Sequence, residues 1–327
     1  MSEKVLVLMA SYNGERYIRE QLDSIIAQDY ENWELVIQDD GSTDGTLEII
    51  QEYCNKESRI TLFKNESQYH GPYYNFHLLN NRFKGVPGYD FYMYSDQDDI
   101  WFPNKISLMI SEIRDCSVPV LLHADMSLCN ENGVVTDSSF NSIFKMSGRD
   151  SYNVFICHKI FGCNIMINKA LFDSIPFLNP DLPNLGILSH DNLNAKFAAA
   201  LGAIRYLSAQ TMMYRRHGEN VTGRSNYKRS KMYIIKRMFE LDSLAKAHAL
   251  TYNQSLIALN LLRKVLEEDD SKTRYLNEID SAIRKGGFVA LKFMSKHKVN
   301  CGRLSESISR RLILFSGLYK KHLIIPE

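Results

Sequence analysis

Three carboxylates lie within four residues of the chain, in the segment Tyr94-Ser95-Asp96-Gln97-Asp98-Asp99-Ile100-Trp101. They directly follow 90–94, a short and largely aromatic run that is typical of a buried strand. Acids this close together repel one another and raise each other's pKa, unless a divalent cation lies among them. Carboxylate oxygens suit hard cations such as Mg²⁺ or Mn²⁺, which also bind substrate phosphates. The cluster therefore predicts a metal and phosphate site, and the alternative interpretation is an acidic loop without a ligand.

Short apolar runs alternate with helical patterns around this cluster. The predicted strands are 5–10, 35–38, 60–63 and 90–95, and the predicted helices between them are 18–26, 47–53 and 72–83. This alternation is typical of βαβ units with a parallel sheet. Right-handed crossovers bring the strand ends to one edge, where open α/β sheets bind ligands. We therefore expect Tyr12, Asp39 and Asp40 to share that edge with the acids at 96–99.

The remaining chain predicts more α/β elements and then a helical region. In order, the predicted elements are a helix from Pro103 to about Arg114, a strand at 120–123, an irregular stretch at 130–155, a strand at 160–167, a loop at 175–188, a helix at 190–201, a strand at 203–214, and helices at 228–268, 272–283 and 303–325. Gly162 interrupts one strand, which often marks close approach of a ligand or backbone. We expect an α/β domain over 1–225 and a helical region over 226–327.

Composition narrows the class of protein. The chain has 327 residues with 45% apolar content and a net charge of +1, so no overall field indicates nucleic-acid binding. The six cysteines include no C-x-x-C pair, and we interpret Cys157 and Cys163 as small buried apolar residues. Nothing in the cysteine pattern demands disulfides, which fits a reducing cytoplasm. We also find no signal peptide and no apolar run of about 20 residues, the length that spans a bilayer.

Three early segments carry a family resemblance. Residues 9–14, 38–44 and 95–101 resemble, in order and spacing, the family 2 glycosyltransferases with a GT-A fold. Later segments at 161–164, 189–191 and 214–223 are similar to the same family. The set looks most like bacterial rhamnosyltransferases that build cell-wall and capsular polysaccharides. The resemblance covers roughly residues 3–225 and implies a doubly wound, mostly parallel GT-A sheet.

The resemblance also implies a donor site at the strand ends. It places a nucleotide-sugar across this edge, with its diphosphate held by Mn²⁺ or Mg²⁺. Ala10 and Tyr12 would line the base and ribose pocket, and Asp40 would accept from the imide N–H of uracil or thymine. Asp96 would contact the ribose, and Asn75 falls near another donor-contacting position.

The metal and the base follow from the same resemblance. Asp98 would be the principal metal ligand, His217 falls at a late metal-binding histidine, and Asp191 falls at the general base. A base must lie in the crevice but away from the metal, and Asp191 begins a new helix about 90 residues after the acids. The alternatives are a helix-dipole charge for Asp191 and a surface histidine for His217.

Other candidates are secondary. Arg215 or Arg216 could bind phosphate directly. Asp39 fits a structural hydrogen-bond acceptor better than a donor contact, and Trp101 fits a packing role that fixes the acid loop. Asp99, His190 and Gly162 are further candidates at the site.

The favoured function is an inverting, metal-dependent transfer of L-rhamnose from dTDP-L-rhamnose to a saccharide acceptor, expected to be lipid-linked. The first alternative is a UDP-sugar donor on the same fold. Alternatives of another class are a nucleotidyltransferase, whose Gly-rich basic loop is missing after the first strand, and a non-catalytic nucleotide-sugar-binding protein. A Rossmann dehydrogenase is excluded, because no G-x-G-x-x-G follows Val5–Ala10.

The end of the chain is basic. Residues 284–327 contain ten Lys and Arg and two Glu, a local net charge of +8. The segment 303–325 mixes these cations with large apolar residues, so it could lie on an anionic inner membrane leaflet. The alternatives are a helix packed on the catalytic domain and a homodimer formed through 228–268.

Overall fold

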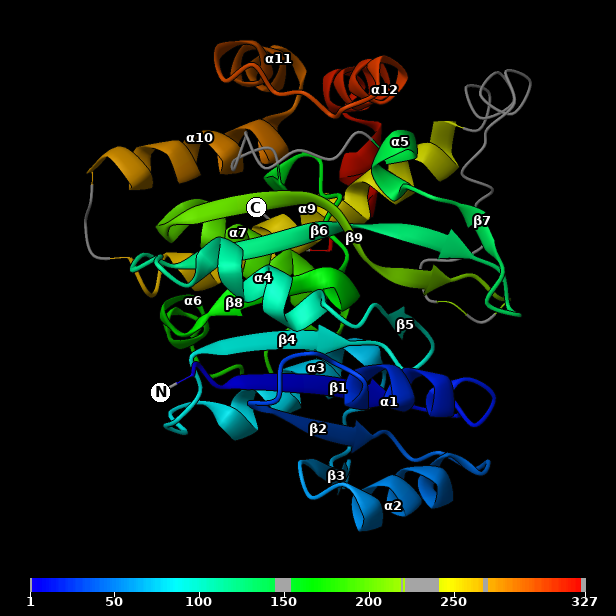
Figure 1. Ribbon diagram of the computed structural model, residues 1–327. Helices are drawn as coiled ribbons and strands as arrows, with labels where there is room; N and C mark the ends of the chain where they lie inside the picture. Colours follow the sequence, from blue (N-terminus) through cyan, green and yellow to red (C-terminus); the bar gives the residue numbers. More distant parts are fainter. Residues whose placement is uncertain (1, 145–153, 219, 221–240, 267–269, 325–327) are drawn as a thin grey trace.

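The computed structural model describes residues 2–144, 154–218, 220, 241–266 and 270–324 (Figure 1). These residues form a mixed sheet with the strand order β3-β2-β1-β4-β8-β6-β9-β5, and β7 pairs with β6. β1 (Val5–Ser11) lies in parallel between β2 (Trp33–Asp39) and β4 (Phe91–Ser95), and β3 (Ile60–Lys64) pairs in parallel with β2. The predicted parallel half of the sheet is therefore confirmed.

The second half of the sheet mixes strand directions. β8 (Ile165–Asn168) runs antiparallel between β4 and β6 (Val120–Cys129). β9 (Ala203–Arg215) pairs in parallel with β6, and the short β5 (Ile100–Trp101) pairs antiparallel with the end of β9. β7 (Val135–Asp137) pairs antiparallel with β6. The pairing of β5 with β9 brings the residues after the acids beside the last residues of β9.

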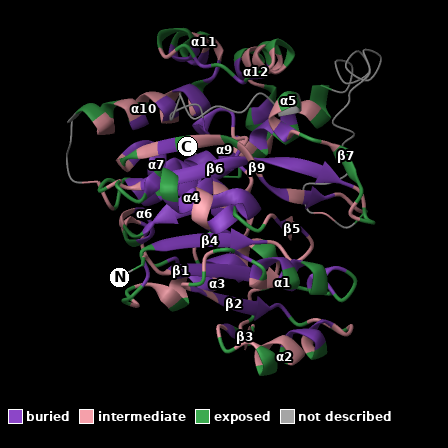
Figure 2. Cartoon of the chain, viewed as in Figure 1, coloured by how far each residue is buried: buried purple, intermediate pink, exposed green. Residues whose placement is uncertain are grey.

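Helices cover both faces of the sheet, which explains the continuous apolar run in β1. Val5, Val7 and Met9 pack on α1 (Ile18–Ile26), α2 (Thr46–Lys56) and α4 (Lys105–Ile113). Leu6 and Leu8 point to the opposite face, which α3 (Pro72–Phe83), α6 (Lys169–Ser174) and α7 (His190–Leu201) cover. A strand buried on both faces has no polar side to alternate with, and Figure 2 shows β1, β2, β4 and β6 buried almost throughout.

The C-terminal region, residues 241–324, extends the core on the α7 side. It contains α9 (Leu241–Leu262), α10 (Asp270–Lys285), α11 (Gly287–Lys296), α12 (Leu304–Ser316) and the 3-10 turn η4 (Leu318–His322). α9 packs on α7, and α10 to α12 lie beyond it, at the end of the molecule opposite α2 and β3 (Figure 1). One apolar cluster runs from Leu6 through Leu256 to Tyr319. The C-terminal region is therefore continuous with the core of the sheet domain.

Several predicted boundaries were wrong. The helix after the acids begins at Lys105 and not at Pro103. The predicted strand 160–167 begins only at Ile165, because Gly162–Asn164 forms a 3-10 turn, η2. The predicted helix 303–325 ends at Ser316, where Gly317 adopts φ 69°, a left-handed conformation that glycine tolerates. The stretch 130–155 contains β7 and α5 (Phe140–Phe144), and 228–240 of a predicted helix lies outside the described residues.

The interpretation of Cys157 was also wrong. Its sulfur forms a disulfide with Cys301, which lies between α11 and α12. Cys163 is buried and unpaired, as predicted. Because a disulfide is more typical of oxidising environments, the cysteines no longer support a reducing compartment. The bond ties the C-terminal region to the segment that precedes β8.

Candidate active site

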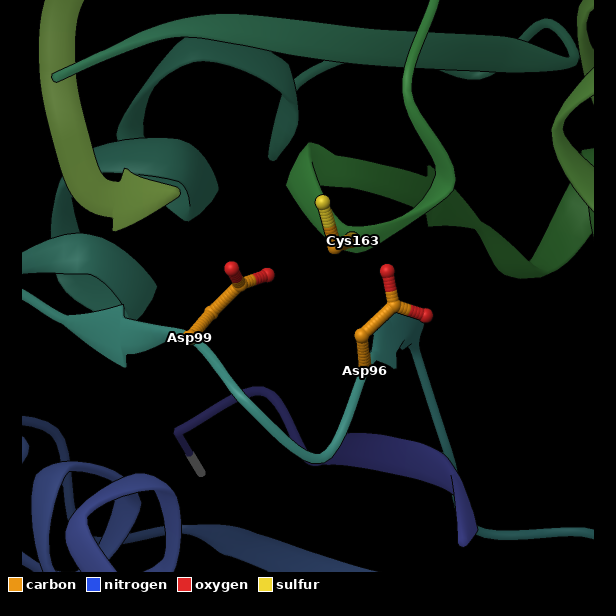
Figure 3. A group of neighbouring side chains, drawn as sticks. All are labelled: Asp96, Asp99 and Cys163. Carbon is orange, nitrogen blue, oxygen red and sulfur yellow. The ribbon is translucent and has the colours of Figure 1, made fainter. Parts of the chain in front are cut away.

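The acid loop, residues 96–99, lies between β4 and β5. Asp96 and Asp99 point toward the thiol of Cys163 in η2, and the ligand atoms of all three lie within 4.8 Å of one another (Figure 3). Burial and the neighbouring carboxylates of Asp98 and Asp191 raise the pKa of Asp96 to about 7. Burial and the carboxylates of Asp98 and Asp96 raise the pKa of Asp99 well above its usual range. A cation near these oxygens would favour their ionised form.

Lys105 is a site residue that the sequence analysis missed. Its ammonium is buried behind the acid loop, where it donates to the carbonyl oxygen of Cys163 at 2.9 Å and lies 4.1 Å from the ring centroid of Trp101. Burial lowers the pKa of Lys105 to about 7. The available signal was its helical spacing from Met109 and Ile113, which places it on the buried face of α4. Trp101 is buried against this lysine, in a packing position.

Asp98 and His217 lie together although 119 residues separate them. His217 Nε2 is 2.6 Å from Asp98 Oδ2, and Asn220 Nδ2 is 3.3 Å from the same oxygen. The imidazole ring also packs against Tyr17, with 4.7 Å between the ring centroids. An imidazole nitrogen and a carboxylate oxygen are both ligands that Mn²⁺ accepts. Asp98 and His217 are therefore a pair of possible metal ligands that lies beside, and not within, the group formed by Asp96, Asp99 and Cys163.

Arg215 holds the acid loop from behind. Its guanidinium is 1% exposed and donates to the carbonyl oxygens of Asp98 and Glu131 and to the carboxylate of Glu20. Its backbone N–H donates to Asp99 Oδ1 at 3.0 Å. The hypothesis that Arg215 binds phosphate does not fit this burial. Arg216 follows β9, and its backbone N–H donates to the carbonyl oxygen of Cys129.

The two acids after β2 have different surroundings. Asp39 accepts from the Ser11 hydroxyl and from the backbone N–H and hydroxyl of Ser42, an arrangement that agrees with a structural acceptor. The Asp40 carboxylate accepts from Asn65 Nδ2 at 2.6 Å and from the Gly71 N–H at 2.6 Å. His70 Nδ1 lies 3.0 Å from the same carboxylate. The Asp40 carboxylate, which the resemblance places against a nucleobase, therefore already accepts hydrogen bonds from other residues of the protein.

The remaining donor-side candidates are divided between the surface and the interior. Tyr12 is 54% exposed, and its backbone N–H and C=O bond the side chain of Gln97, which joins the loop after β1 to the acid loop. Ala10 is half-buried near the end of β1. Asn75 is buried, and its amide exchanges two hydrogen bonds of 2.7 Å with Gln38. The Asn75 amide therefore joins α3 to β2, and its two hydrogen bonds are made within the fold.

Asp191 lies in the first turn of α7, on the other side of the site. Its Oδ2 is 3.2 Å from His158 Nε2, and its Oδ1 accepts from the Asn192 N–H at 2.7 Å. Burial by itself would raise the pKa of Asp191, but His158 and His190 hold it below its usual range. Burial lowers the pKa of His158. Asp191 is therefore a carboxylate at neutral pH, and His158, a second residue that the sequence analysis missed, is its neighbour.

His190 and Gly162 form a packing contact. The imidazole of His190 lies between the rings of Phe76 and Tyr94, at centroid distances of 3.9 and 4.7 Å, and burial lowers its pKa to about 4. A Cβ at Gly162 would lie 1.9 Å from His190 Nε2. The group that approaches Gly162 closely is therefore the His190 side chain and not a ligand. This geometry gives neither Gly162 nor His190 a role in ligand binding.

Comparison with known proteins identifies the family. The family model "Glycosyl transferase family 2" matches residues 6–175. The dTDP-rhamnosyl transferase RfbG of Shigella flexneri is 32% identical over 230 residues, which are 68% of this chain and 77% of the relative. The chain belongs to glycosyltransferase family 2. It is therefore a glycosyltransferase, which replaces the nucleotidyltransferase and non-catalytic interpretations.

Further relatives of this glycosyltransferase agree with the assignment. The UDP-Glc:alpha-D-GlcNAc-diphosphoundecaprenol beta-1,3-glucosyltransferase WfgD of Escherichia coli is 29% identical over 196 residues, covering 58% of this chain and 72% of the relative. Among solved structures, TarS 1–349 of S. aureus in complex with UDP-GlcNAc superposes with a TM-score of 0.53 at 20% identity, over 98% of this chain and 91% of that 1–349 fragment. That likeness confirms the GT-A fold. Among the residues that the structure describes, no helix is long and apolar enough to cross a membrane.

Proposed function

We propose that this glycosyltransferase moves L-rhamnose from dTDP-L-rhamnose to a saccharide acceptor with inversion at the anomeric carbon. The observation that carries the proposal is the ionised Asp191 on α7, paired with a histidine and separate from the Asp98–His217 pair. The 32% identical relative is named a dTDP-rhamnosyl transferase, which supports the donor. The Escherichia coli relative is named for UDP-Glc, and this keeps a UDP-sugar as the second candidate donor.

Asp98 and His217 would hold the divalent cation, and Asp96 would contact the donor ribose beside it. When bound, Mn²⁺ or Mg²⁺ supplies charge stabilisation for the leaving diphosphate. Tyr12 and Ala10 would line the base and ribose pocket at the end of β1. Asp40 would act on the nucleobase side indirectly, because its carboxylate accepts hydrogen bonds from Asn65 and Gly71 and so holds the loop that contains them in place.

Asp191 would act on the acceptor side. Its carboxylate accepts the proton of the acceptor hydroxyl while that oxygen bonds to the anomeric carbon. The bond from this carbon to the diphosphate oxygen breaks, and its electron pair leaves with the nucleoside diphosphate. Attack from the face opposite the leaving group inverts the configuration through an oxocarbenium-like transition state. A weakly basic carboxylate can take this role, because the hydroxyl loses its proton only as the new bond forms.

The C-terminal region offers a surface for a lipid-linked acceptor. Its exposed apolar face consists of large side chains on one side of α12 and at the start of α11, namely Leu304, Ile308, Leu312, Phe315 and Phe288. Leu304 and Phe288 are 77% and 79% exposed, and the rings of Phe288 and Phe315 are in contact at 5.2 Å. Exposed lysines at 285, 292 and 320 accompany this face. Apolar side chains beside cations fit an anionic lipid surface.

We therefore propose that residues 1–225 bind the donor and carry the catalytic groups, and that 226–327 serve the acceptor side at a membrane surface. The test is a transfer assay with a panel of dTDP- and UDP-sugars, with Mn²⁺, with Mg²⁺ and with chelator. We expect dTDP-L-rhamnose to give the fastest metal-dependent transfer or donor hydrolysis. Preference for a UDP-sugar would replace the donor, and full activity in chelator would remove the cation.

A further inference from the structure

Three consecutive residues connect the C-terminal region to Asp191. Cys157 is bonded to Cys301, and Lys159 pairs with Glu306 of α12 at 2.5 Å. Lys159 also donates to the carbonyl oxygen of Cys301. Between them, His158 contacts Asp191. The C-terminal region therefore holds the residues on both sides of the histidine that contacts Asp191.

α9 supports the same corner from a second direction. Ser255 Oγ donates to the Phe155 carbonyl oxygen at 2.7 Å, just before this segment. Gln254 Oε1 accepts from the hydroxyl of Ser189, which is the N-cap residue of α7, at 3.1 Å. Neighbouring residues of one helix thus hold both the segment before His158 and the turn before Asp191. The contacts are independent of the disulfide.

The protonation of the pair fixes which group donates. Burial lowers the pKa of His158, so its ring is neutral at pH 7 and carries one N–H. Because Asp191 is a carboxylate, Nε2 must carry that hydrogen and donate it to Oδ2. The Asn192 N–H holds the other oxygen from within α7. A carboxylate held in this way has one orientation, and its remaining lone pairs point in a defined direction.

We propose that His158 is a positioning residue for the base Asp191, and that the C-terminal region holds His158 in place through Cys157 and Lys159. The proposal rests on the proposed function of Asp191. A misplacement of about 1 Å can cost about 10²-fold in rate, which is the size of effect that such an orienting hydrogen bond can have.

The first experiment compares His158→Ala, His158→Gln and Asp191→Asn at saturating acceptor. We expect turnover of His158→Ala to fall about 10- to 100-fold with donor KM changed less than about twofold. Gln can present a neutral N–H at similar reach, so His158→Gln should recover most of the turnover. If turnover per folded molecule is unchanged in His158→Ala while Asp191→Asn is inactive, the positioning role of His158 is overturned and the proposed base is not. Near-normal turnover of Asp191→Asn would instead overturn the proposed base.

A pH profile separates positioning from simple structural support. Without the donor at position 158, burial raises the pKa of Asp191, so the acidic limb of turnover should move to higher pH in His158→Ala. The other titratable groups that act on the pair are unchanged, namely His190 and Lys196 of α7, Tyr73 of α3, Asp96 of the acid loop and His123 of β6. A loss of melting temperature with an unmoved acidic limb would show a structural role and contradict the proposal.

The second experiment tests the link to the C-terminal region. The double variant Cys301→Ser, Glu306→Gln removes the disulfide and the ion pair, and we expect turnover to fall about 3- to 10-fold. Its acidic limb should shift in the same direction as that of His158→Ala. Glu278→Gln is the matched control, because Glu278 pairs with Lys296 and His297 within the C-terminal region. Equal turnover of the double variant and the control at matched folded fraction would overturn the link.

Discussion

The two sides of the active site are built in different ways. The acid loop and the loops after β1 and β2 are joined by neighbours in the sheet, such as Gln97 with the backbone of Tyr12 and Thr46 Oγ1 with the Gly14 N–H. The Asp191 side is joined by contacts between remote segments, including a disulfide that spans 144 residues. The first side follows from sheet topology and the second from packing of the C-terminal region. A substitution in the C-terminal region should therefore change the function of the base Asp191 more than it changes the binding of the donor.

The largest effect should come from Asp191→Asn. The amide keeps the shape and one of the two acceptor oxygens but cannot accept a proton at neutral pH, so turnover should fall about 10²- to 10⁴-fold. Donor affinity should be nearly unchanged, since the residue acts on the acceptor. Turnover, donor affinity and melting temperature are measured on one preparation, with Asp173→Asn as a surface control. A helix-cap role predicts only about 1 kcal/mol of lost stability, and normal turnover would leave the enzyme without this base.

Asp98→Ala should weaken binding of the metal and the nucleotide on the donor side of the active site. Loss of outer-shell partners alone costs about 10- to 100-fold in metal affinity, so loss of a ligand should weaken Mn²⁺-dependent binding of dTDP or UDP by at least about 10²-fold. Calorimetry with and without chelator measures this. The variant with Mn²⁺ should resemble the wild-type protein in chelator. Wild-type affinity of Asp98→Ala in the presence of metal would show that the acid loop has been misinterpreted.

Gly162→Ala tests the packing that underlies the Asp191 side. Its Cβ would lie 1.9 Å from the buried His190 ring, which Phe76 and Tyr94 confine. Overpacking of this kind costs about 1 to 3 kcal/mol, measured as a lower free energy of unfolding. Gly218→Ala is the control, because a Cβ at that position would have no described atom within 4 Å. Equal stability of the two variants would mean that His190 moves aside freely.

The smallest effect should come from the exposed apolar face. Truncation of the chain after about residue 300 would also remove the disulfide partner Cys301 and the buried Tyr319. The double variant Leu312→Gln, Phe315→Ser changes only exposed side chains and is therefore the better probe. We expect its sedimentation with anionic vesicles to fall about tenfold and wild-type binding to weaken with salt. Phe177→Ser, an exposed aromatic residue outside the C-terminal region, is the matched control. Vesicle binding equal to the control would exclude this face as the lipid contact.

The sequence by itself determined the donor half of the protein. The buried runs of β1, β2 and β4 and the turns after them are local patterns, and parallel crossovers have one hand. That combination is sufficient to predict that Tyr12, Asp40 and Asp96 share one edge of the sheet. The packing role of Trp101 and the structural role of Asp39 could also be predicted, because each lies inside one of these local motifs.

Only the tertiary structure decided the other half. Nothing in the sequence around Cys157, His158 or Lys159 indicates Cys301, Asp191 or Glu306 as partners, since such contacts depend on how α9 and α12 pack on the sheet. The burial of Arg215, a charged residue that would ordinarily be exposed, could not be predicted for the same reason, whereas the helical spacing of Lys105 from Met109 and Ile113 did indicate the buried face of α4. Local periodicity fixes which face of a helix is apolar, but the partner of that face is chosen by contacts across the whole chain.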